Sequence, residues 1–335
     1  MKIGILGAGT WGTALAALLA KNGHDVSLWS ALPEEAEQLK STGRHRNLPE
    51  VILPHGIEYT IDIAEAIRGA GLVIFVTPSE FIRPTAARAA AHIEPHQIVA
   101  SAAKGVEKET LMTMTEIISE EIDGCGVSPK ALVALSGPTH AEEVALGLPT
   151  SIVAASENEE AALTVASLFS NSCLRAYVNS DVRGVELCGA LKNIIAIAAG
   201  ICHGIEFGDN AKAMLMTRGM TEIARLGIAM GCEKSTFYGL SGIGDLIVTC
   251  TSRHSRNNRC GELIGKGLTY EEAQREIGMV VEGYHALEAA VELSQKYNVE
   301  MPITQAVYDV IKRGRSPYPV IRELMTRGIK DESVI

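Results

Sequence analysis

Short apolar runs alternate with alanine-rich helical patterns through the first half of the chain. The runs stand at residues 3–6, 26–29, 72–76, 98–101, 132–135, 151–154 and 174–178. Continuous apolar runs of this kind are typical of strands that are covered on both faces. Because strands separated by helical segments require right-handed crossovers, residues 1–180 are predicted to form an α/β domain with a parallel, doubly wound sheet.

The hydrophobic pattern changes after the last of these runs. Apolar residues then recur at helical spacing, first over 185–202, where Ser180 is a candidate N-cap, and again from Ala211 onward. The sequence has no internal repeat, low-complexity linker or long charge run at this change of pattern. We therefore predict a helical domain over 181–335 that follows the first domain directly.

The charge balance narrows the classes of partner. The 335 residues include 30 Lys and Arg against 40 Asp and Glu, for a formal net charge of -10. Such a chain has no general attraction for nucleic acid or for an anionic membrane, so any anion must bind at a local basic site. The most apolar segment, 185–205, is interrupted by Glu186, Lys192 and His203, so no membrane span is predicted.

Cysteine and histidine usage favours a cytoplasmic protein without a metal. The seven cysteines include no CxxC pair, which indicates reduced thiols, and the nine histidines include no HExxH motif. A strand is expected to begin at Lys2, where a secretory signal would need a basic start and a longer apolar stretch.

A glycine-rich loop at residues 7–12, Gly-Ala-Gly-Thr-Trp-Gly, follows the first predicted strand and opens a helical run. In this context Gly7 permits a tight turn, Gly9 lets a diphosphate approach the backbone, and Gly12 lets the helix pack on the strand. The start of the helix offers N–H groups and partial positive charge to the diphosphate. The loop predicts a dinucleotide cofactor.

The end of the second predicted strand leaves the choice of cofactor open. NAD sites usually have an acidic residue there for the ribose hydroxyls, but this chain has Trp29-Ser30-Ala31. Without a carboxylate NADP is admissible, yet the nearest basic residues are Arg44 and Arg46.

Lys192 is the strongest catalytic candidate. It lies in the middle of an apolar helical segment, where burial disfavours the charged form unless a function or a partner holds it. The alternative is a lysine that reaches solvent or pairs with Glu186 or another carboxylate. The glycine-dense segment 239–244 predicts a close backbone approach, and Asp245 follows it directly.

Three further segments carry candidate binding residues. Residues 253–259 hold three arginines, which suit a phosphate, although a solvated basic loop is the alternative. Residues 101–105 and 136–141 each follow a predicted strand, so Lys104, Thr139 and Ala141 are expected beyond the carboxyl ends of strands, where ligands bind in such sheets. The alternative for each segment is an ordinary turn, since Gly and Pro are common in turns.

Taken together, these motifs resemble the bacterial NAD(P)-dependent glycerol-3-phosphate dehydrogenases. The resemblance rests on segments 7–12, 103–105, 136–143, 189–193, 240–246, 255–257 and 279–283 and extends from Lys2 to about Gly328. It implies a Rossmann domain followed by an all-helical domain. It also implies reversible reduction of dihydroxyacetone phosphate to sn-glycerol 3-phosphate with NADPH or NADH, for phospholipid synthesis, by a cytoplasmic homodimer.

The resemblance also implies roles for individual residues. Catalytic positions match Lys192, Lys104, Asp245, Asn193 and Thr249; cofactor contacts match Gly7, Gly9, Thr10, Trp11, Gly12, Lys104, Ala141, Arg256, Val280 and Glu282; substrate contacts match Lys104, Gly137, Thr139, Lys192, Asp245, Ser255, Arg256 and Asn257. This chain departs from the family pattern just after the second predicted strand, where it has Ala31-Leu32 and many relatives have a basic residue. The competing interpretations are a 3-hydroxy-acid or 6-phosphogluconate type dehydrogenase and a dinucleotide sensor without chemistry.

Overall fold

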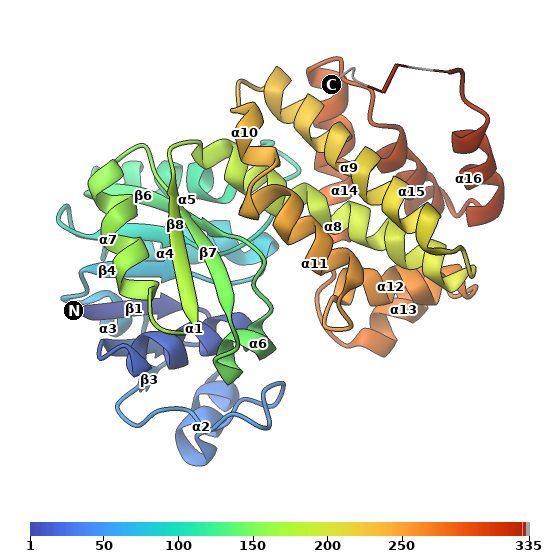
Figure 1. Ribbon diagram of the computed structural model, residues 1–335. Coiled ribbons are helices and arrows are strands. Elements are labelled where there is room, and N and C mark those ends of the chain that lie inside the picture. The colour runs from blue at the N-terminus through green and yellow to red at the C-terminus, as the bar shows by residue number, and fades with distance from the viewer. Residues whose placement is uncertain (330, 333–335) are drawn as a thin grey trace. The chain divides into compact units, whose positions relative to one another are not determined.

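The structure, a computed structural model, describes residues 1–329 and 331–332. The chain forms two compact units (Figure 1). The α/β unit comprises Met1–Lys104 and Thr113–Val182, and the helical unit comprises Gly105–Met112 and Arg183–Ile335. Of the predicted second domain, 181–335, residues 330 and 333–335 lie outside the described residues.

The α/β unit is built on one sheet of eight strands in the order β3-β2-β1-β4-β5-β6-β7-β8. The strands are β1 (Lys2–Leu6), β2 (Asp25–Trp29), β3 (Glu58–Thr60), β4 (Leu72–Phe75), β5 (Ile98–Ser101), β6 (Ala131–Ser136), β7 (Thr150–Ala155) and β8 (Leu174–Asn179). Each of the seven apolar runs forms a strand, which confirms the doubly wound α/β class. The short edge strand β3 was not predicted, because three residues with no buried side chain carry little pattern.

One pairing departs from the predicted all-parallel sheet. Strand β7 runs antiparallel to β6, and β8 is parallel to β7. The connection between β6 and β7 contains only the six-residue helix α6 (Ala141–Leu146). At 1.5 Å per residue this helix is about 9 Å long, whereas a six-residue strand is about 20 Å long. The chain therefore re-enters the sheet at the edge where β6 ended.

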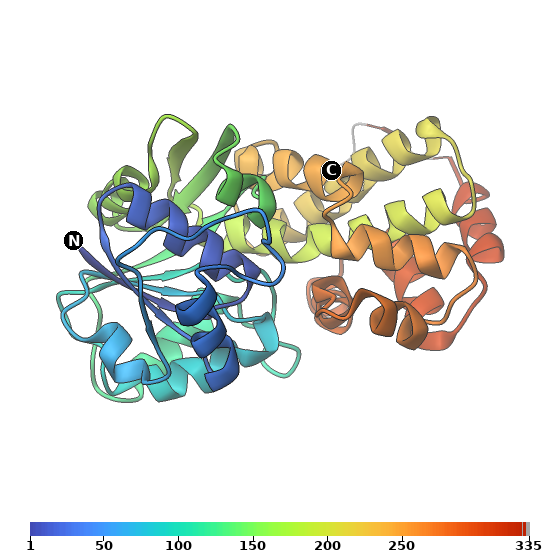
Figure 2. The same cartoon turned by 90° about the horizontal axis from the view of Figure 1, so that it is seen from below.

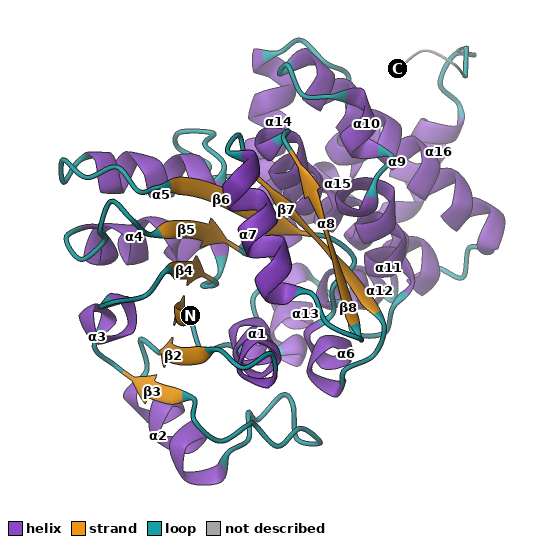
Figure 3. Cartoon of the chain, turned by 60° about the vertical axis from the view of Figure 1, so that its left-hand side comes forward, coloured by secondary structure: helices purple, strands orange, loops and turns teal. Residues whose placement is uncertain are grey.

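Helices cover both faces of the sheet. They are α1 (Thr10–Lys21), α2 (Pro33–Thr42), α3 (Ile63–Ile67), α4 (Ile82–Ala90), α5 (Met114–Asp123), α6 and α7 (Glu159–Phe169), with a 3₁₀ turn at Ser79–Phe81. Figure 3 shows α3, α4 and α5 on one side of the strands and α1 and α7 on the other. Local signals fix several ends: Pro33 starts α2, Gly43 ends it at φ 61°, and Thr113 with Glu116 forms a capping box on α5.

The helical unit is organised around α8 (Val182–Gly204), which has helices on either side in Figures 1 and 2. The other elements are α9 (Asp209–Ala229), α10 (Lys234–Phe237), a π-helical turn (Leu240–Gly244), α11 (Asp245–Thr251), α12 (Arg256–Gly265), α13 (Tyr270–Ile277), α14 (Glu282–Lys296), α15 (Pro302–Arg313) and α16 (Pro317–Met325). By length and hydropathy α8 would suit a membrane, but its apolar stretch is wholly buried inside the protein. It is the core helix of this unit.

Helices α8 and α12 cross with their backbones in contact. A Cβ atom on Gly200 would lie 1.9 Å from the carbonyl oxygen of Asn258, and one on Gly261 would lie 2.0 Å from that of Ile197. Real Cβ atoms do not approach that closely, so glycine is required on both helices. The crossing fixes the start of α12 beside the middle of α8.

A buried carboxylate from α9 holds the start of α15. Glu222 is 3% exposed, and its two oxygens accept hydrogen bonds from the backbone N–H of Ile303 at 2.7 Å and of Thr304 at 3.2 Å. Burial raises the pKa of Glu222 to about 7, against the lowering effect of these hydrogen bonds. The helix start is therefore held by a group that changes charge near neutral pH.

The segment Gly105–Met112 leaves the α/β unit and packs with the helices of the other unit. Val106 belongs to the apolar core of the helical unit, and Lys108 Nζ lies 2.8 Å from Glu288 Oε2 on α14. The hydrophobic pattern gave no indication of this excursion, because its contacts are with residues far along the sequence.

Candidate active site

The glycine loop between β1 and α1 has the geometry that a dinucleotide requires. Gly7 has φ 129°, a conformation that residues with a side chain rarely adopt, and a Cβ on Gly12 would lie 1.8 Å from the carbonyl oxygen of Gly7. A Cβ on Gly9, by contrast, would meet no described atom within 4 Å. Gly7 and Gly12 are therefore needed for the turn and the packing, while Gly9 leaves open space next to the loop.

The start of α1 faces that open space. Gly9 is the N-cap, Thr10 and Trp11 are the first residues of α1, and no acidic side chain lies in its first turn. The side chain of Thr10 accepts a hydrogen bond from Asn47 Nδ2 at 3.0 Å. A helix start with open space at the glycine fits a diphosphate, so these residues fit a nicotinamide dinucleotide.

The ends of β5 and β6 bring together the other predicted residues of the α/β unit. The carbonyl oxygen of Gly137 accepts hydrogen bonds from Lys104 Nζ at 3.2 Å and from Thr139 Oγ1 at 3.1 Å. Gly137 has φ 134°, and Ala141 is the first residue of α6. Lys104 and Thr139 thus lie at the carboxyl edge of the sheet, as parallel strand ends require.

In the helical unit, Lys192 forms a buried ion pair with Asp245. Lys192 is 5% exposed and Asp245 1% exposed. Lys192 Nζ donates to Asp245 Oδ1, and also to Thr249 Oγ1 at 2.6 Å. Thr249 in turn donates to the backbone carbonyl of Asp245 at 2.6 Å. The carboxylate of this ion pair comes from 53 residues further along the chain, and the three side chains form one polar cluster in an apolar core.

The π-helical turn before α11 places Asp245 in this cluster. A Cβ on Gly242 would lie 2.0 Å from the carbonyl oxygen of Phe237, so the backbone packs directly on backbone there. This is the close approach that the glycine density predicted. A π-turn is frequent at functional sites, because it rotates the residues that follow it relative to a regular helix.

Asn193 and Asn257 link three helices. Asn257 Nδ2 donates to Asn193 Oδ1 at 3.0 Å, and Asn257 Oδ1 accepts from the backbone N–H of Gly283 at 2.9 Å. Asn193 Nδ2 donates to the carbonyl oxygen of Gly189 at 3.2 Å. The network ties α8, next to Lys192, to the starts of α12 and α14. It therefore brings Glu282, the first residue of α14, and Val280, which precedes the helix, toward the same region of this unit.

The basic segment 253–259 leads into α12 and forms its first turn. Ser255 is the N-cap, and its Oγ accepts from the backbone N–H of Asn258 at 3.2 Å. Arg256 is the first helical residue, whereas Arg259 lies further along and contacts Glu276 at 3.5 Å. The predicted anion site thus coincides with a helix N-terminus that carries one arginine at its first position.

The predicted residues fall into two sets, one in each unit. The α/β unit holds Gly7, Gly9, Thr10, Trp11, Gly12, Lys104, Gly137, Thr139 and Ala141, and the helical unit holds Lys192, Asn193, Asp245, Thr249, Ser255, Arg256, Asn257, Val280 and Glu282. The first set lies at the glycine loop and beyond the ends of β5 and β6. The second set lies around the Lys192–Asp245 pair and at the starts of α12 and α14.

Sequence reasoning missed one charged side chain at the end of β2. Ser30 Oγ donates to Glu35 Oε2 at 2.6 Å. Glu35 lies in the first turn of α2. The signal that could have found it is Pro33, which marks a helix start directly after the strand and so turns Glu35 back toward the strand end.

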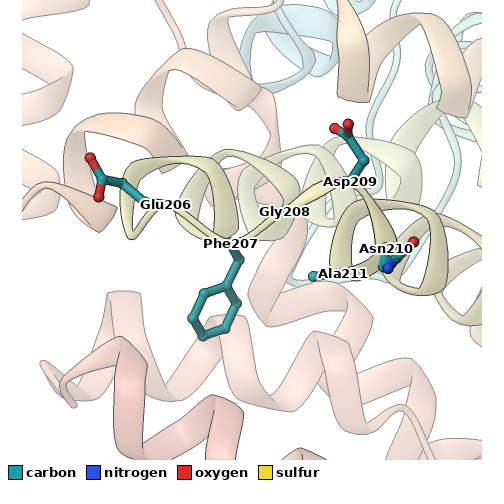
Figure 4. Close-up of a pocket in the computed structure, with 6 residues that line it drawn as sticks. All are labelled: Glu206, Phe207, Gly208, Asp209, Asn210 and Ala211. Carbon is teal, nitrogen blue, oxygen red and sulfur yellow. The ribbon is translucent and has the colours of Figure 1, made fainter.

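The pocket between α8 and α9 is a separate feature. It is an open turn lined by residues 206–211, and the ring of Phe207 contacts Tyr318 edge-on at 6.3 Å. Figure 4 shows the Phe207 ring and the Asp209 carboxylate pointing in opposite directions from this turn. None of the predicted site residues lines it.

The thiols and potential metal ligands add no further centre. All seven cysteines are described and none of them is in a disulfide bond, and burial raises the pKa of Cys250 and of Cys260 to about 12. Within residues 1–329 and 331–332, no three His, Cys, Asp or Glu side chains group as a metal site.

Comparison with known proteins identifies the family. The N-terminal model of NAD-dependent glycerol-3-phosphate dehydrogenase matches residues 2–162, and the C-terminal model matches residues 181–322. The chain is 52% identical to glycerol-3-phosphate dehydrogenase [NAD(P)+] 2 of Lactobacillus delbrueckii subsp. bulgaricus over 99% of this chain and 98% of the relative. It is 49% identical to the enzyme of Enterococcus faecalis over 99% and 97%.

Comparison with solved structures gives the same family as comparison of sequences. A crystal structure of glycerol-3-phosphate dehydrogenase from Coxiella burnetii superposes with a TM-score of 0.92 at 36% identity, covering 97% of this chain and 99% of that one. With both family models and full-length relatives matched, the chain belongs to the NAD-dependent glycerol-3-phosphate dehydrogenase family.

Proposed function

We propose that this chain interconverts dihydroxyacetone phosphate and sn-glycerol 3-phosphate with NADH or NADPH and supplies glycerol 3-phosphate for phospholipid synthesis. The observation that carries the proposal is the buried pair of Lys192 and Asp245, in a chain of this family. Burying a charged pair in an apolar core costs stability, so its presence indicates a function. Donating a proton to a carbonyl group is such a function.

The reaction needs a proton donor at the substrate oxygen. The reduced nicotinamide, when bound, supplies the hydride. Negative charge then develops on the carbonyl oxygen, and the Lys192 ammonium stabilises it and donates the proton. Asp245 and Thr249 hold the amine in one orientation. In the reverse direction Lys192 accepts the proton.

The start of α12 is proposed to hold the substrate phosphate. Ser255 caps the helix, Arg256 brings a guanidinium, and the N-terminal N–H groups with the helix dipole favour an anion. The Asn257 side chain already bonds to Asn193 and Gly283, so its contribution is chiefly to position α8 against α12. Binding the remote phosphate orients a small flexible ketone.

The remaining predicted residues are proposed to contact cofactor and substrate. Lys104, Gly137 and Thr139, which share one hydrogen-bonded cluster, are assigned to the substrate, Lys104 also to the cofactor. The cofactor is assigned to Gly7, Gly9, Thr10, Trp11, Gly12, Ala141, Arg256, Val280 and Glu282. These assignments extend the family resemblance to positions whose local geometry is compatible with them.

Location, assembly and domain limits form a separate part of the proposal. We infer a cytoplasmic homodimer with a dinucleotide-binding domain over 1–180 and a substrate-binding domain over 181–335. The seven cysteines form no disulfide and five of them are buried, which supports a reducing compartment. Sedimentation of the purified chain at several concentrations tests the dimer.

The test of function is oxidation of NADH and NADPH by the purified chain with three kinds of substrate: dihydroxyacetone phosphate, dihydroxyacetone, and the keto acids that hydroxy-acid dehydrogenases reduce. We expect turnover with the phosphorylated ketone and little with the others, because only it carries a phosphate for the start of α12. Indifference to dihydroxyacetone phosphate would refute the proposal, and turnover of keto acids would favour the hydroxy-acid type of enzyme.

A further inference from the structure

The end of β2 presents a carboxylate that the linear sequence does not show. Ser30 follows the last residue of β2, and its Oγ accepts the backbone N–H of Leu32 at 3.1 Å. With that lone pair engaged, the hydroxyl proton is directed to Glu35 Oε2 at 2.6 Å. Glu35 is therefore held at the strand end by a hydrogen bond from the residue that occupies the usual acidic position.

A buried imidazole lies next to the other carboxylate oxygen. His45 Nε2 lies 3.8 Å from Glu35 Oε1, and the imidazole is 3% exposed. His45 Nδ1 accepts the backbone N–H of Asn47 at 3.1 Å, so its proton is on Nε2, which faces the carboxylate. The imidazole of His45, and then the Ser30 hydroxyl and the charge of Arg46, lower the pKa of Glu35 despite partial burial. Glu35 is thus ionised at neutral pH.

The segment that contains His45 and Asn47 is hydrogen-bonded to the start of α1, directly after the glycine loop. Asn47 Nδ2 donates to Thr10 Oγ1 at 3.0 Å. The backbone N–H of Gly7 donates to the carbonyl oxygen of Trp29 at 3.0 Å, so β1 and β2 leave the sheet side by side. Glu35 and the diphosphate-binding loop therefore stand on one framework within the α/β unit. In this fold the adenosine ribose lies beyond the end of the second strand.

We propose that Glu35 binds the adenosine ribose hydroxyls and makes this chain prefer NADH to NADPH. A 2′-phosphate carries nearly two negative charges, and a fixed carboxylate at the ribose repels it. Arg46 is the basic residue whose charge acts on Glu35, and it offsets part of this repulsion, whereas Nη1 of Arg44 is directed to the carbonyl oxygen of Pro49 at 2.5 Å. For partly exposed charges a few ångströms apart, the repulsion corresponds to a preference of about tenfold or more. The inference rests on the proposed function only in assuming that the site takes a nicotinamide dinucleotide.

The experiment measures binding without turnover. The chain has two tryptophans, and both Trp11 and Trp29 belong to this region, so quenching of their fluorescence reports occupancy. The full-length chain is titrated with NADH and NADPH, and separately with adenosine 5′-monophosphate and adenosine 2′,5′-bisphosphate. We expect the ligand without the 2′-phosphate to bind about tenfold more tightly in each pair.

Two matched variants separate the specific carboxylate from general charge. Glu35→Gln keeps the shape and an acceptor for Ser30 but removes the charge, so the NADH preference is expected to fall at least fivefold, mainly through tighter NADPH binding. Glu34→Gln removes the same charge from the exposed neighbouring residue in the same turn and should leave the ratio unchanged. Thermal unfolding confirms that each variant folds.

The outcomes distinguish this inference from the proposed function. Tighter binding of NADPH by the natural chain, or an unchanged ratio in folded Glu35→Gln, overturns the role of Glu35 while leaving the dehydrogenase activity intact. If Glu35→Gln does not fold, the ratio of NADH to NADPH affinity measured on the natural chain still tests the predicted preference for NADH. A chain that binds neither dinucleotide overturns both.

Discussion

Glycines 9 and 12 stand three positions apart in one loop, and the structure predicts opposite consequences for the same substitution. Gly12→Ala places a Cβ 1.8 Å from the carbonyl oxygen of Gly7, which is backbone and cannot rotate away. Gly9→Ala places a Cβ where no described atom lies within 4 Å. The first change therefore strains the protein, and the second changes only the space that a ligand would occupy.

The magnitude for Gly12→Ala follows from this distance. An ordinary contact needs roughly 3.4 Å, so the start of α1 must move by more than about 1 Å from β1 and disturb buried packing. Overpacking of this kind costs about 1–3 kcal/mol or more, and the gain in helix propensity from glycine to alanine offsets about 1 kcal/mol. Because the clash is with backbone, the upper end of this range applies, and we expect Gly12→Ala to lower the free energy of unfolding by about 2 kcal/mol, the difference between about 3 and about 1 kcal/mol.

Gly9→Ala is the matched control. Gly9 has φ -62° and ψ -179°, which alanine adopts without strain. Alanine is a somewhat poorer N-cap than glycine, so its free energy of unfolding should fall by less than about 1 kcal/mol. Its methyl group, however, occupies the proposed diphosphate position, and NADH affinity should drop about tenfold or more.

The assay pairs urea unfolding with NADH titration of both variants. The expected result is a stability loss in Gly12→Ala alone and a loss of NADH affinity in both, since a displaced helix start also misplaces its N–H groups. Equal stability losses in the two variants would refute the packing argument. Unchanged NADH affinity in Gly9→Ala would refute the placement of the diphosphate.

Three other substitutions test the helical unit. Lys192→Ala should reduce turnover about a hundredfold or more, as expected for loss of a general acid, while NADH titration shows binding unchanged; full activity would remove Lys192 from the mechanism. Arg256→Gln should raise KM for dihydroxyacetone phosphate about tenfold or more through loss of a bidentate phosphate contact, and an unchanged KM would place the phosphate elsewhere. Glu222→Gln should alter the pH dependence of stability. The carboxyl of Glu222 has a pKa of about 7 in the folded protein, against 4.5 for an ordinary glutamate. Between these pH values the native state binds a proton that the unfolded chain does not. The free energy of unfolding therefore falls by about 3 kcal/mol as the pH rises through this range. The difference in unfolding free energy between Glu222→Gln and the natural chain, measured from pH 4.5 to 7, should change by that amount, and parallel pH profiles would show that Glu222 is not the titrating group.

The sequence by itself determined the features that depend on near neighbours along the chain. The apolar runs predicted the main strands because a buried strand needs only its own residues to be apolar. The glycine loop was readable because the turn, the open space and the helix packing involve residues 7, 9 and 12 together. The glycine density before Asp245 likewise indicated a close approach, although not the π-turn that produces it.

Only the tertiary structure decided which distant residues meet. Lys192 has Asp245 as its partner because α8 and α11 pack together, and the sequence left Glu186 equally open. Glu35 reaches the end of β2 because α2 folds back on the strand, so a site that lacks a carboxylate in sequence has one in space. The antiparallel pairing of β7 and the packing of residues 105–112 in the helical unit likewise depend on contacts between residues distant in sequence. Periodicity records which face of an element is buried, whereas the choice of partner depends on crossing and connection geometry, which local composition does not encode.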